Sequence, residues 1–582
     1  MLAWKIGGDQ GEGIDSTGDV LATVLNRMGY YVYGYKWFSS RIKGGHTHYK
    51  VRIATTPVAA PTLRTDILVA LNQETIDKNA HELDGGLLLA DSGFDPVVPD
   101  TVKAHLLTLP LTEMAKEHGS VVMRNMVAVG ASVALLNLPV EPFAEYVASK
   151  FARKGEAVME ANRRAVRAGY EAVRERYPHL LTFSLGKPTP GDRLVVTGNE
   201  MTALGALAGG CRVFCGYPIT PASDIMEALA KWFPLVGGAV VQMEDELGSI
   251  VAAVGAGFAG VRAMTATSGP GISLMQESIG LASMAEIPVV IVDTQRGGPS
   301  TGMPTKQEQS DLLALLNGGH GEGPRIVITP GSPEESFEDA YEAFNLAETY
   351  QNPVIIATDL SLALWKQTVE RRVVASPDVP IERGRVVSPE ELLAMGQEVF
   401  ERYRLTPDGI SPRSLPGEKY GQYLATGSEH SVTGKVNEDP KNRVQMMNKR
   451  LEKIRAINRH RVGIKMEGPA DADLVLMGIN STVGVIREAK AMLEAEGHRV
   501  AIAWLRTLAP FPTEQVREAL AKARRVLVVE QNATAQLLTW MRAQGAADAR
   551  FESFVKYDGV PMAPEEVVAA ARGSLSRVEV VR

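Results

Sequence analysis

The chain has 582 residues, which is too long for one hydrophobic core, so roughly three or four domains are expected. Hydrophobic residues make up 45% and charged residues 22%, a balance typical of folded globular proteins rather than disordered ones. The formal net charge of −7 excludes the strong basic bias of proteins that bind nucleic acids or anionic membranes.

The two cysteines, Cys211 and Cys215, cannot supply the thiolate ligand set of an iron–sulfur cluster or a cysteine-only zinc site. Two buried structural thiols in a reducing compartment are favoured over a redox pair. The first residues lack the basic and apolar pattern of a secretory signal. No run reaches the ~18 apolar residues that span a bilayer. We therefore expect a cytoplasmic protein without membrane contact.

Residues 1–187 are predicted to form a first α/β domain. A glycine-rich turn at residues 7–13 separates an apolar run from a helical pattern. Such a turn lets the backbone approach an anion at a helix N-terminus, but Asp9 and Glu12 would repel a phosphate. A tight structural turn is therefore favoured over a nucleotide site.

The loop at residues 39–48 combines hydroxyl groups, cations and glycines. Two interpretations are equally supported: a solvated basic loop, or a site for an anionic group such as a coenzyme phosphate. The residues that would form such a site are Arg41, Lys43, Gly44 and Gly45.

Residues 192–365 are predicted to form a second domain, with a proline- and glycine-rich linker before it. Repeated strand–helix units predict a doubly wound parallel sheet, which binds ligands beyond the carboxyl ends of its strands. Loop-forming segments that adjoin these strands gather within residues 216–305, so this stretch is the expected functional centre. The strand-like runs lie at residues 239–243, 263–267, 287–293, 325–328 and 353–357.

The C-terminal part of the chain divides into two predicted regions. Residues 366–465, rich in proline and charge, indicate an extended connector or interface segment that ends in a basic helix. Residues 466–582 return to an α/β pattern.

An acidic trio, Glu244, Asp245 and Glu246, follows the first strand of the central stretch. Acidic residues in a first helical turn stabilise the helix dipole, which is the structural interpretation. The functional interpretation is a carboxyl group in a water-poor cleft, with a raised pKa, that exchanges a proton with a heterocyclic nitrogen. The residues alone support both equally.

Three further loops offer polar ligands in the same stretch. Residues 267–271 place two hydroxyl groups beside free backbone N–H groups at a strand-to-helix turn. Two prolines stiffen the loop at residues 217–221 and hold Thr220. Arg296 stands alone in a loop of glycine and hydroxyl residues, where its fork suits a carboxylate, and Thr305 follows it.

Together these segments resemble the α subunit of 2-oxoacid:ferredoxin oxidoreductases, of the fused γ–α, 2-oxoglutarate synthase-like type. The resemblance covers nearly the whole chain, including Glu429 and His430 in the connector. It implies a γ-type domain, a thiamine-diphosphate pyrimidine-binding domain and a transketolase C-terminal-like domain. The segments that carry it lie at residues 217–221, 243–257, 267–271, 295–302 and 443–450.

The resemblance implies oxidative decarboxylation of a 2-oxo acid with coenzyme A, yielding acyl-CoA and CO₂ and passing electrons to ferredoxin. Glu246 would hydrogen-bond the aminopyrimidine ring, with Pro218, Ser268 and Gly269 as further cofactor contacts. The residues that would bind the substrate are Tyr217, Thr220, Arg296 and Thr305, with Arg296 on its carboxylate. The γ-type domain would help to bind coenzyme A.

The sequence has no Gly-Asp-Gly followed by Asn-Asn, the motif that binds diphosphate through a metal in such enzymes. The resemblance therefore implies a separate β subunit that carries Mg²⁺ and a [4Fe–4S] cluster, in a dimer of αβ units active only as a complex. We favour 2-oxoglutarate over pyruvate or a broad range of 2-oxo acids. A non-catalytic assembly subunit and a self-sufficient transferase are the alternatives.

Overall fold

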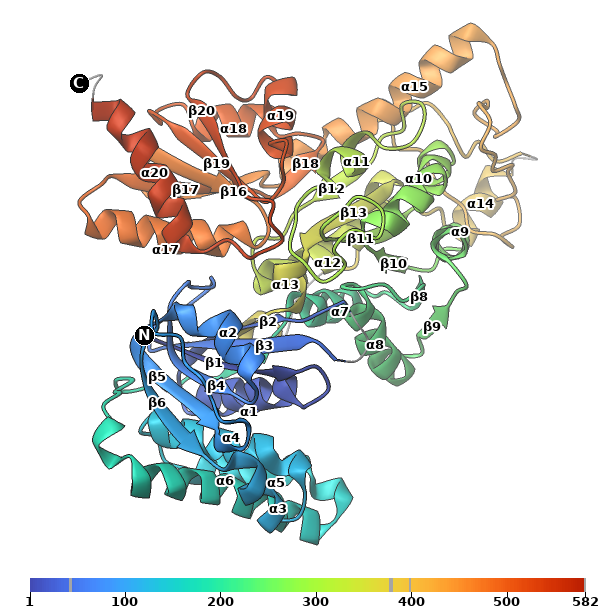
Figure 1. Ribbon diagram of the computed structural model, residues 1–582. Coiled ribbons are helices and arrows are strands. Elements are labelled where there is room, and N and C mark those ends of the chain that lie inside the picture. The colour runs from blue at the N-terminus through green and yellow to red at the C-terminus, as the bar shows by residue number, and fades with distance from the viewer. Residues whose placement is uncertain (41–43, 376–379, 397–398, 580–582) are drawn as a thin grey trace. The chain divides into compact units, whose positions relative to one another are not determined.

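The computed structural model describes residues 1–40, 44–375, 380–396 and 399–579 (Figure 1). The chain divides into two compact units. Unit 1 contains residues 1–196, 364–375 and 563–565, and unit 2 contains residues 197–363, 376–562 and 566–582.

Unit 1 is built on an eight-stranded sheet in the order β6-β5-β4-β1-β3-β2-β14-β7 (Figure 1). The strands β1, β4, β5 and β6 run parallel, whereas β3, β2, β14 and β7 pair antiparallel. The loop between β2 and β3 is too short for the crossover that a parallel pair needs, so this half departs from the parallel pairing expected. The strands are β1 (Leu2–Asp9), β2 (Tyr31–Trp37), β3 (His46–Ala54), β4 (Thr65–Ala70), β5 (Leu83–Asp91), β6 (Lys103–Leu109), β7 (Arg193–Val196) and β14 (Lys366–Glu370).

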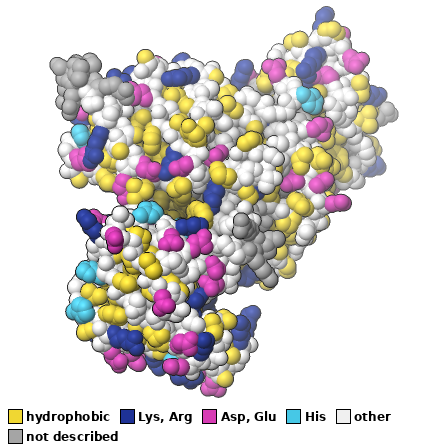
Figure 2. All heavy atoms as spheres, viewed as in Figure 1, with side chains coloured by type: hydrophobic (Ala, Val, Ile, Leu, Met, Phe, Trp, Pro, Cys, Tyr) yellow, Lys and Arg dark blue, Asp and Glu magenta, His cyan; other side chains and the backbone are white. Residues whose placement is uncertain are grey.

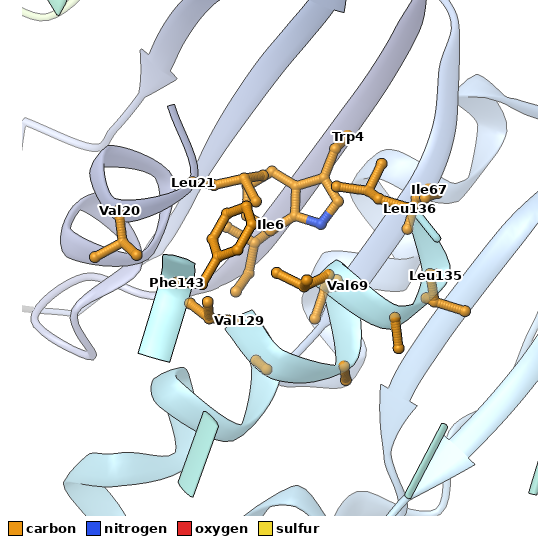
Figure 3. Close-up of a cluster of buried hydrophobic side chains, with 14 of the residues drawn as sticks. Trp4, Ile6, Val20, Leu21, Ile67, Val69, Val129, Leu135, Leu136 and Phe143 are labelled. Atoms are coloured by element: carbon orange, nitrogen blue, oxygen red, sulfur yellow. The ribbon is translucent and has the colours of Figure 1, made fainter. Parts of the chain in front are cut away.

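Helices pack on the sheet of unit 1 and form its main core. Figure 3 shows side chains of β1 and β4 facing those of α1, α4 and α5 around Trp4, which is fully buried. The helices are α1 (Ile14–Arg27), α2 (Gln73–Asn79), α3 (Leu111–Glu117), α4 (Arg124–Leu135), α5 (Glu141–Lys150) and α6 (Glu156–Arg176).

Unit 2 contains a seven-stranded sheet in the order β18-β12-β13-β11-β10-β8-β9, parallel except at β18. Apolar clusters cover both faces, as a doubly wound sheet requires. The strands are β8 (Val213–Gly216), β9 (Ala239–Gln242), β10 (Ala263–Thr267), β11 (Val289–Gln295), β12 (Ile326–Ile328), β13 (Pro353–Asp359) and β18 (Thr507–Ala509). The helices are α7 (Gly198–Ala208), α8 (Ser223–Trp232), α9 (Glu246–Phe258), α10 (Gly269–Met284), α11 (Leu312–Asn317), α12 (Pro333–Tyr350) and α13 (Leu360–Leu364).

The C-terminal part of unit 2 carries a five-stranded sheet in the order β15-β17-β16-β19-β20. Its neighbour β18 joins the larger sheet through β12, so the two sheets share one apolar cluster. Its strands are β15 (Ile464–Glu467), β16 (Leu474–Gly478), β17 (Val500–Leu505), β19 (Val526–Glu530) and β20 (Phe551–Val555). Its helices are α17 (Thr482–Ala495), α18 (Thr513–Ala519), α19 (Gln536–Ala543) and α20 (Pro564–Glu579).

The connector contains α14 (Pro389–Met395), α15 (Pro440–Arg455) and α16 (Ile457–His460). The basic helix α15 is fixed by buried ion pairs, in which Lys449 and Lys453 contact Glu286 at 2.6 and 3.0 Å. Arg450 of the same helix pairs with Glu429 at 2.7 Å. These ion pairs explain why α15, which has little apolar patterning, still packs firmly on the rest of unit 2.

The fold class predicted from the sequence is confirmed, because all three sheets are rich in parallel strands with helices between them. Acidic and basic side chains are interspersed over the face shown in Figure 2, in keeping with the modest net charge. Among the described residues, no helix has both the length and the apolar character needed to cross a bilayer.

The crossing of α4 and α6 in unit 1 depends on two glycines. A methyl group on Gly130 would overlap the carbonyl oxygen of Val166, and one on Gly169 would overlap that of Val127. Backbone atoms cannot move aside as a flexible side chain can, so any larger residue forces the helices apart.

We expect Gly130→Ala to lower the free energy of unfolding of unit 1 by about 3 kcal/mol or more, through overpacking. Gly573→Ala in α20 is the matched control, because no atom lies within 4 Å of the added methyl group. Helix propensity alone makes the control neutral or slightly stabilising. Thermal unfolding of both variants is the measurement. Equal unfolding midpoints for Gly130→Ala and Gly573→Ala would contradict the close contact between α4 and α6.

Candidate active site

The candidate site lies in unit 2, at the carboxyl ends of β8, β10 and β11 and at the start of α9 and α10. These three strands are adjacent in the sheet, so the loops after them meet at one edge. This is the edge at which open α/β sheets bind ligands.

The structure separates the acidic trio into three environments. Glu244 is exposed, and Asp245 is the N-cap of α9, where its side chain accepts a hydrogen bond from the Gly248 N–H at 2.7 Å. Glu246 is the first residue of the helix and is only 7% exposed. The structural interpretation therefore applies to Asp245, and Glu246 is the carboxyl group enclosed by the protein.

The buried Glu246 carboxyl group packs against the first turn of α10. A methyl group on Gly271 would lie 2.9 Å from Glu246 Oε1 and closer still to Thr267 Oγ1, so only glycine permits this approach. The hydroxyl group of Ser268 is buried beside this turn and has no hydrogen-bond partner within the described chain. The arrangement places a buried carboxyl group and a hydroxyl group without a partner in the described chain together at the start of α10.

Arg296 follows β11 and is 7% exposed. Its Nη1 donates a hydrogen bond to the Thr220 carbonyl oxygen, whereas its Nε has no partner among the described residues. Within the same residues, no acidic side chain lies close enough to form an ion pair with it. Burial lowers the pKa of Arg296, and the charges of Asp311 and Glu246 oppose that shift. A buried cation without a counter-ion is costly, so this position suits an anionic ligand.

The loop after β8 carries Thr220 to the same place. The peptide bond between Thr220 and Pro221 is cis, and Asn199 Nδ2 donates a hydrogen bond to the Pro221 carbonyl oxygen at 2.8 Å. Tyr217 and Pro218 on the same loop are exposed, Tyr217 by 42%. Thr220 therefore lies beside Arg296, and Tyr217 and Pro218 lie at the open side of the loop.

The loop after Arg296 folds back on itself. The Gly297 N–H donates to the Lys306 carbonyl oxygen at 3.0 Å, and the Met303 N–H donates to the Gly297 carbonyl oxygen at 2.9 Å. Thr305 follows Arg296 by nine positions in the sequence. The loop nevertheless brings these two residues close, because the next residue after each, Lys306 and Gly297, share a hydrogen bond.

Two further carboxyl groups, the fully buried Asp293 and the half-buried Asp311, were not predicted from the sequence. Asp293 lies in β11, and Asp311 precedes α11 with its carboxylate oxygens against Gly269. An acidic residue at the end of an apolar strand run is the only local signal for Asp293. Asp311 has no such signal, because only the tertiary fold brings it to α10.

The glycine-rich turn of unit 1 is closed by its own side chains. Glu12 Oε2 accepts a hydrogen bond from the Asp9 N–H at 3.0 Å, and Arg124 pairs with Glu12 at 2.6 Å. These contacts support the structural interpretation of the turn.

Part of the predicted coenzyme loop lies outside the described residues, namely Arg41 and Lys43. Gly44 and Gly45 are described and have left-handed φ values of 74° and 87°. The Gly45 carbonyl oxygen accepts a hydrogen bond from the Gln10 N–H at 2.9 Å. A coenzyme A contact at this loop remains a prediction.

Three family models match successive parts of the chain. The thiamine diphosphate-binding model of pyruvate flavodoxin/ferredoxin oxidoreductases matches residues 204–449. The pyruvate ferredoxin/flavodoxin oxidoreductase model matches residues 3–172, and core domain II of pyruvate:ferredoxin oxidoreductase matches residues 472–567.

Relatives match over nearly the whole chain. The 2-oxoacid:ferredoxin oxidoreductase 2 subunit alpha of Aeropyrum pernix is 36% identical and covers 99% of this chain and 98% of its own length. The chain belongs to the 2-oxoacid:ferredoxin oxidoreductase family. Its resemblance to the α subunits is thereby confirmed. The 2-oxoglutarate oxidoreductase subunit KorA of Mycobacterium tuberculosis is 32% identical, over 98% of this chain and 91% of that protein.

A solved structure has the same fold. The 2-oxoglutarate:ferredoxin oxidoreductase from Magnetococcus marinus, with 2-oxoglutarate, coenzyme A and succinyl-CoA bound, superposes with a TM-score of 0.92. It is 36% identical and covers 99% of both chains. The family has a thiamine diphosphate-binding domain, and in this chain that domain contains the site at β8, β10 and β11.

The described residues include no group of three or more His, Cys, Asp or Glu side chains that could hold a metal ion. Cys211 and Cys215 are both buried free thiols, as predicted. Burial raises the pKa of Cys211 to about 12, which keeps this thiol protonated and unreactive at neutral pH.

If Glu246 exchanges a proton with the cofactor, Glu246→Gln should lower the turnover number roughly 100-fold or more, because an amide cannot do so. Glu244→Gln is the matched control, since Glu244 is exposed and should leave turnover unchanged. Acyl-CoA formation by the assembled complex measures both, with gel filtration as a check of assembly. Loss of turnover in Glu244→Gln, with normal turnover in Glu246→Gln, would show that Glu244 and not Glu246 is the catalytic carboxyl group.

Proposed function

We propose that this chain is the α subunit of a 2-oxoglutarate:ferredoxin oxidoreductase. With its partner subunit it would convert 2-oxoglutarate and coenzyme A to succinyl-CoA and CO₂, with the electrons passed to ferredoxin. The observation that carries this proposal is the buried Arg296 guanidinium, which has no carboxylate partner among the described residues.

Arg296 binds the 2-carboxylate of the substrate in this proposal. A guanidinium presents parallel N–H donors to a carboxylate, and burial strengthens the attraction because water is excluded. Thr220 orients Arg296 through its carbonyl oxygen, and its hydroxyl group lies on the same short loop. Thr305, held beside the start of the arginine loop, and Tyr217 line the substrate side.

The polar groups beside Glu246 suit the aminopyrimidine ring of thiamine diphosphate. A buried carboxyl group, and a buried hydroxyl group on Ser268 without a partner among the described residues, supply polar atoms there, next to the closely packed Gly269 and Gly271. When bound, the cofactor would supply a nucleophilic carbon for reaction with the 2-oxo group. Glu246 would hold and return a proton at the ring nitrogen, and Pro218 and Gly269 would be further contacts of the ring.

A β subunit completes the site in this proposal. The sequence has no diphosphate-binding motif and no cysteine set for a cluster, so Mg²⁺ and the [4Fe–4S] cluster belong to the partner, which passes electrons to ferredoxin. Exposed apolar side chains lie on the elements that form or adjoin the site, and β9 is at the edge of its sheet, where β8 is its partner. These side chains are Tyr217 42%, Val241 43%, Leu247 46%, Val251 52% and Leu274 48% exposed. We define them as the apolar face and assign it to the partner, in a dimer of αβ units.

Two relatives support 2-oxoglutarate as the substrate. The structure from M. marinus holds 2-oxoglutarate, coenzyme A and succinyl-CoA, and the protein from M. tuberculosis is named for 2-oxoglutarate. Both align with at least nine-tenths of their own length. In unit 1, the loop with Gly44 and Gly45 is the proposed coenzyme A contact.

We expect Arg296→Ala to raise KM for 2-oxoglutarate and for pyruvate about 100-fold or more, because removing one partner of a buried charge pair costs roughly 2–5 kcal/mol. Both acids share the 2-carboxylate, so both should be affected. Initial rates of acyl-CoA formation by the complex, across a panel of 2-oxo acids, provide the measurement.

The wild-type complex should show its highest kcat/KM with 2-oxoglutarate in the same panel. An unchanged KM in Arg296→Ala would show that Arg296 does not bind the substrate. A higher kcat/KM with pyruvate than with 2-oxoglutarate would keep the role of Arg296 but show that pyruvate is the preferred substrate.

The apolar face yields a separate test. Val251→Glu places a charge on the exposed side of α9 and should abolish co-purification with the β subunit, because an unpaired charge is costly in an interface. Val462→Glu is the control, as Val462 is 57% exposed but not part of the apolar face. Loss of the complex in both variants, or in neither, would contradict the assignment.

A further inference from the structure

Two acidic side chains, Asp293 in β11 and Asp311 next to the last residue of β11, have no role in the function proposed above. Asp293 is fully buried, and neither of its carboxylate oxygens has a hydrogen-bond partner in the described chain. Asp311 Oδ2 is likewise buried without a partner in the part of the chain that the structure describes. Buried carboxyl groups are normally hydrogen-bonded, so each exception asks for an explanation.

Asp311 is held in place by Gln295, the last residue of β11, which precedes Arg296. Its N–H donates to Gln295 Oε1 at 3.1 Å, and Gln295 Nε2 in turn donates to the Thr358 carbonyl oxygen at 3.2 Å. A methyl group on Gly269 would lie 2.7 Å from each carboxylate oxygen of Asp311. The carboxylate is therefore fixed between the start of α10 and the residue that precedes Arg296.

The charges around Asp311 act in opposite directions. Burial, followed by the neighbouring Glu308 carboxylate, raises the pKa of Asp311 to about 6, and the Arg296 guanidinium opposes this rise. Burial and then the Asp311 carboxylate raise the pKa of Asp293 well above its usual range. Glu246, the remaining acid near Arg296, contacts the same turn of α10 at Gly271. Burial thus favours the protonated form of Asp293, and Asp311 is the acid of the two that ionises more readily.

We propose that Asp311 sets how strongly Arg296 attracts a substrate carboxylate, and that Asp311 takes up a proton from solvent when an anionic 2-oxo acid binds. Its negative charge competes with the substrate for the guanidinium. A bound carboxylate brings a second negative charge into the same poorly hydrated space, which favours the protonated form of Asp311. Asp311 is a positioning residue here, since it acts through Arg296. The inference rests on the proposed role of Arg296.

Calorimetric binding of N-oxalylglycine to the complex loaded with thiamine diphosphate tests this proposal. This compound resembles 2-oxoglutarate but is unreactive, because its 2-carbonyl group is an amide. Titrations in buffers of different ionisation enthalpy count the protons taken up. The wild type should take up protons, most strongly within about one pH unit of 6, and should bind more weakly as the pH rises.

Asp311→Asn should abolish the proton uptake and make the affinity independent of pH between about 5.5 and 7.5. At pH ~7.5 it should bind the compound about three- to tenfold more tightly than the wild type, because the competing charge is gone. Asp311→Ser serves as a second variant if the asparagine lowers the thermal stability of the complex. Asp293→Asn is the matched control, since asparagine has the shape of the protonated acid and should retain the uptake.

Proton uptake that persists in Asp311→Asn and disappears in Glu308→Gln would overturn the assignment in favour of Glu308. Absence of uptake in the wild type, with binding that still depends on Arg296, would overturn it outright. Arg296→Ala distinguishes failure of the proposed role of Arg296 from failure of the inference about Asp311. Unchanged affinity in that variant would overturn the role of Arg296 and, with it, this inference.

Discussion

The site depends on one constraint, which is that the Arg296 guanidinium is buried without an ion-pair partner among the described residues. Breaking a buried ion pair typically costs roughly 3–5 kcal/mol, so an arginine in this position needs an anion nearby. The fold supplies one carbonyl oxygen, from Thr220, and the more distant charges of Asp311 and Glu246. This partial compensation keeps the side chain in place and leaves its charge available to a ligand.

The surrounding structure fixes the arginine at both ends of its loop. Parallel pairing sets β11 between β10 and β13, so that Arg296 follows a strand at the centre of the sheet. The far end of the loop is tied to the C-terminal part of unit 2, where the Gln309 N–H donates to the Gln531 carbonyl oxygen at 2.7 Å. Gln309 Nε2 also donates to Asp359 Oδ2 at the end of β13, at 2.8 Å. Ser481 Oγ donates to the same oxygen at 2.7 Å. If the substrate binds here as proposed, a loop fixed in this way reduces the entropy lost on binding.

Much of this could be predicted from the sequence, because the strongest signals are local. The apolar run at residues 263–267 coincides with β10, and the proline and arginine loops carry the resemblance to the family. The antiparallel half of unit 1 could not be predicted from apolar runs, which do not encode strand direction. The residues alone left the acidic trio open, and the resemblance pointed to Glu246. The capping role of Asp245 and the enclosure of Glu246 depend on how α9 begins. The meeting of Asp311 with α10 is a contact between distant segments, for which no local pattern exists.

The most direct measurement is an experimental structure of the αβ complex with thiamine diphosphate and N-oxalylglycine bound. The account predicts the 2-carboxylate of the ligand within hydrogen-bonding distance of the Arg296 guanidinium, with the Glu246 carboxyl group on the aminopyrimidine ring. An acidic side chain of the partner subunit paired with Arg296, and the ligand bound elsewhere, would contradict it.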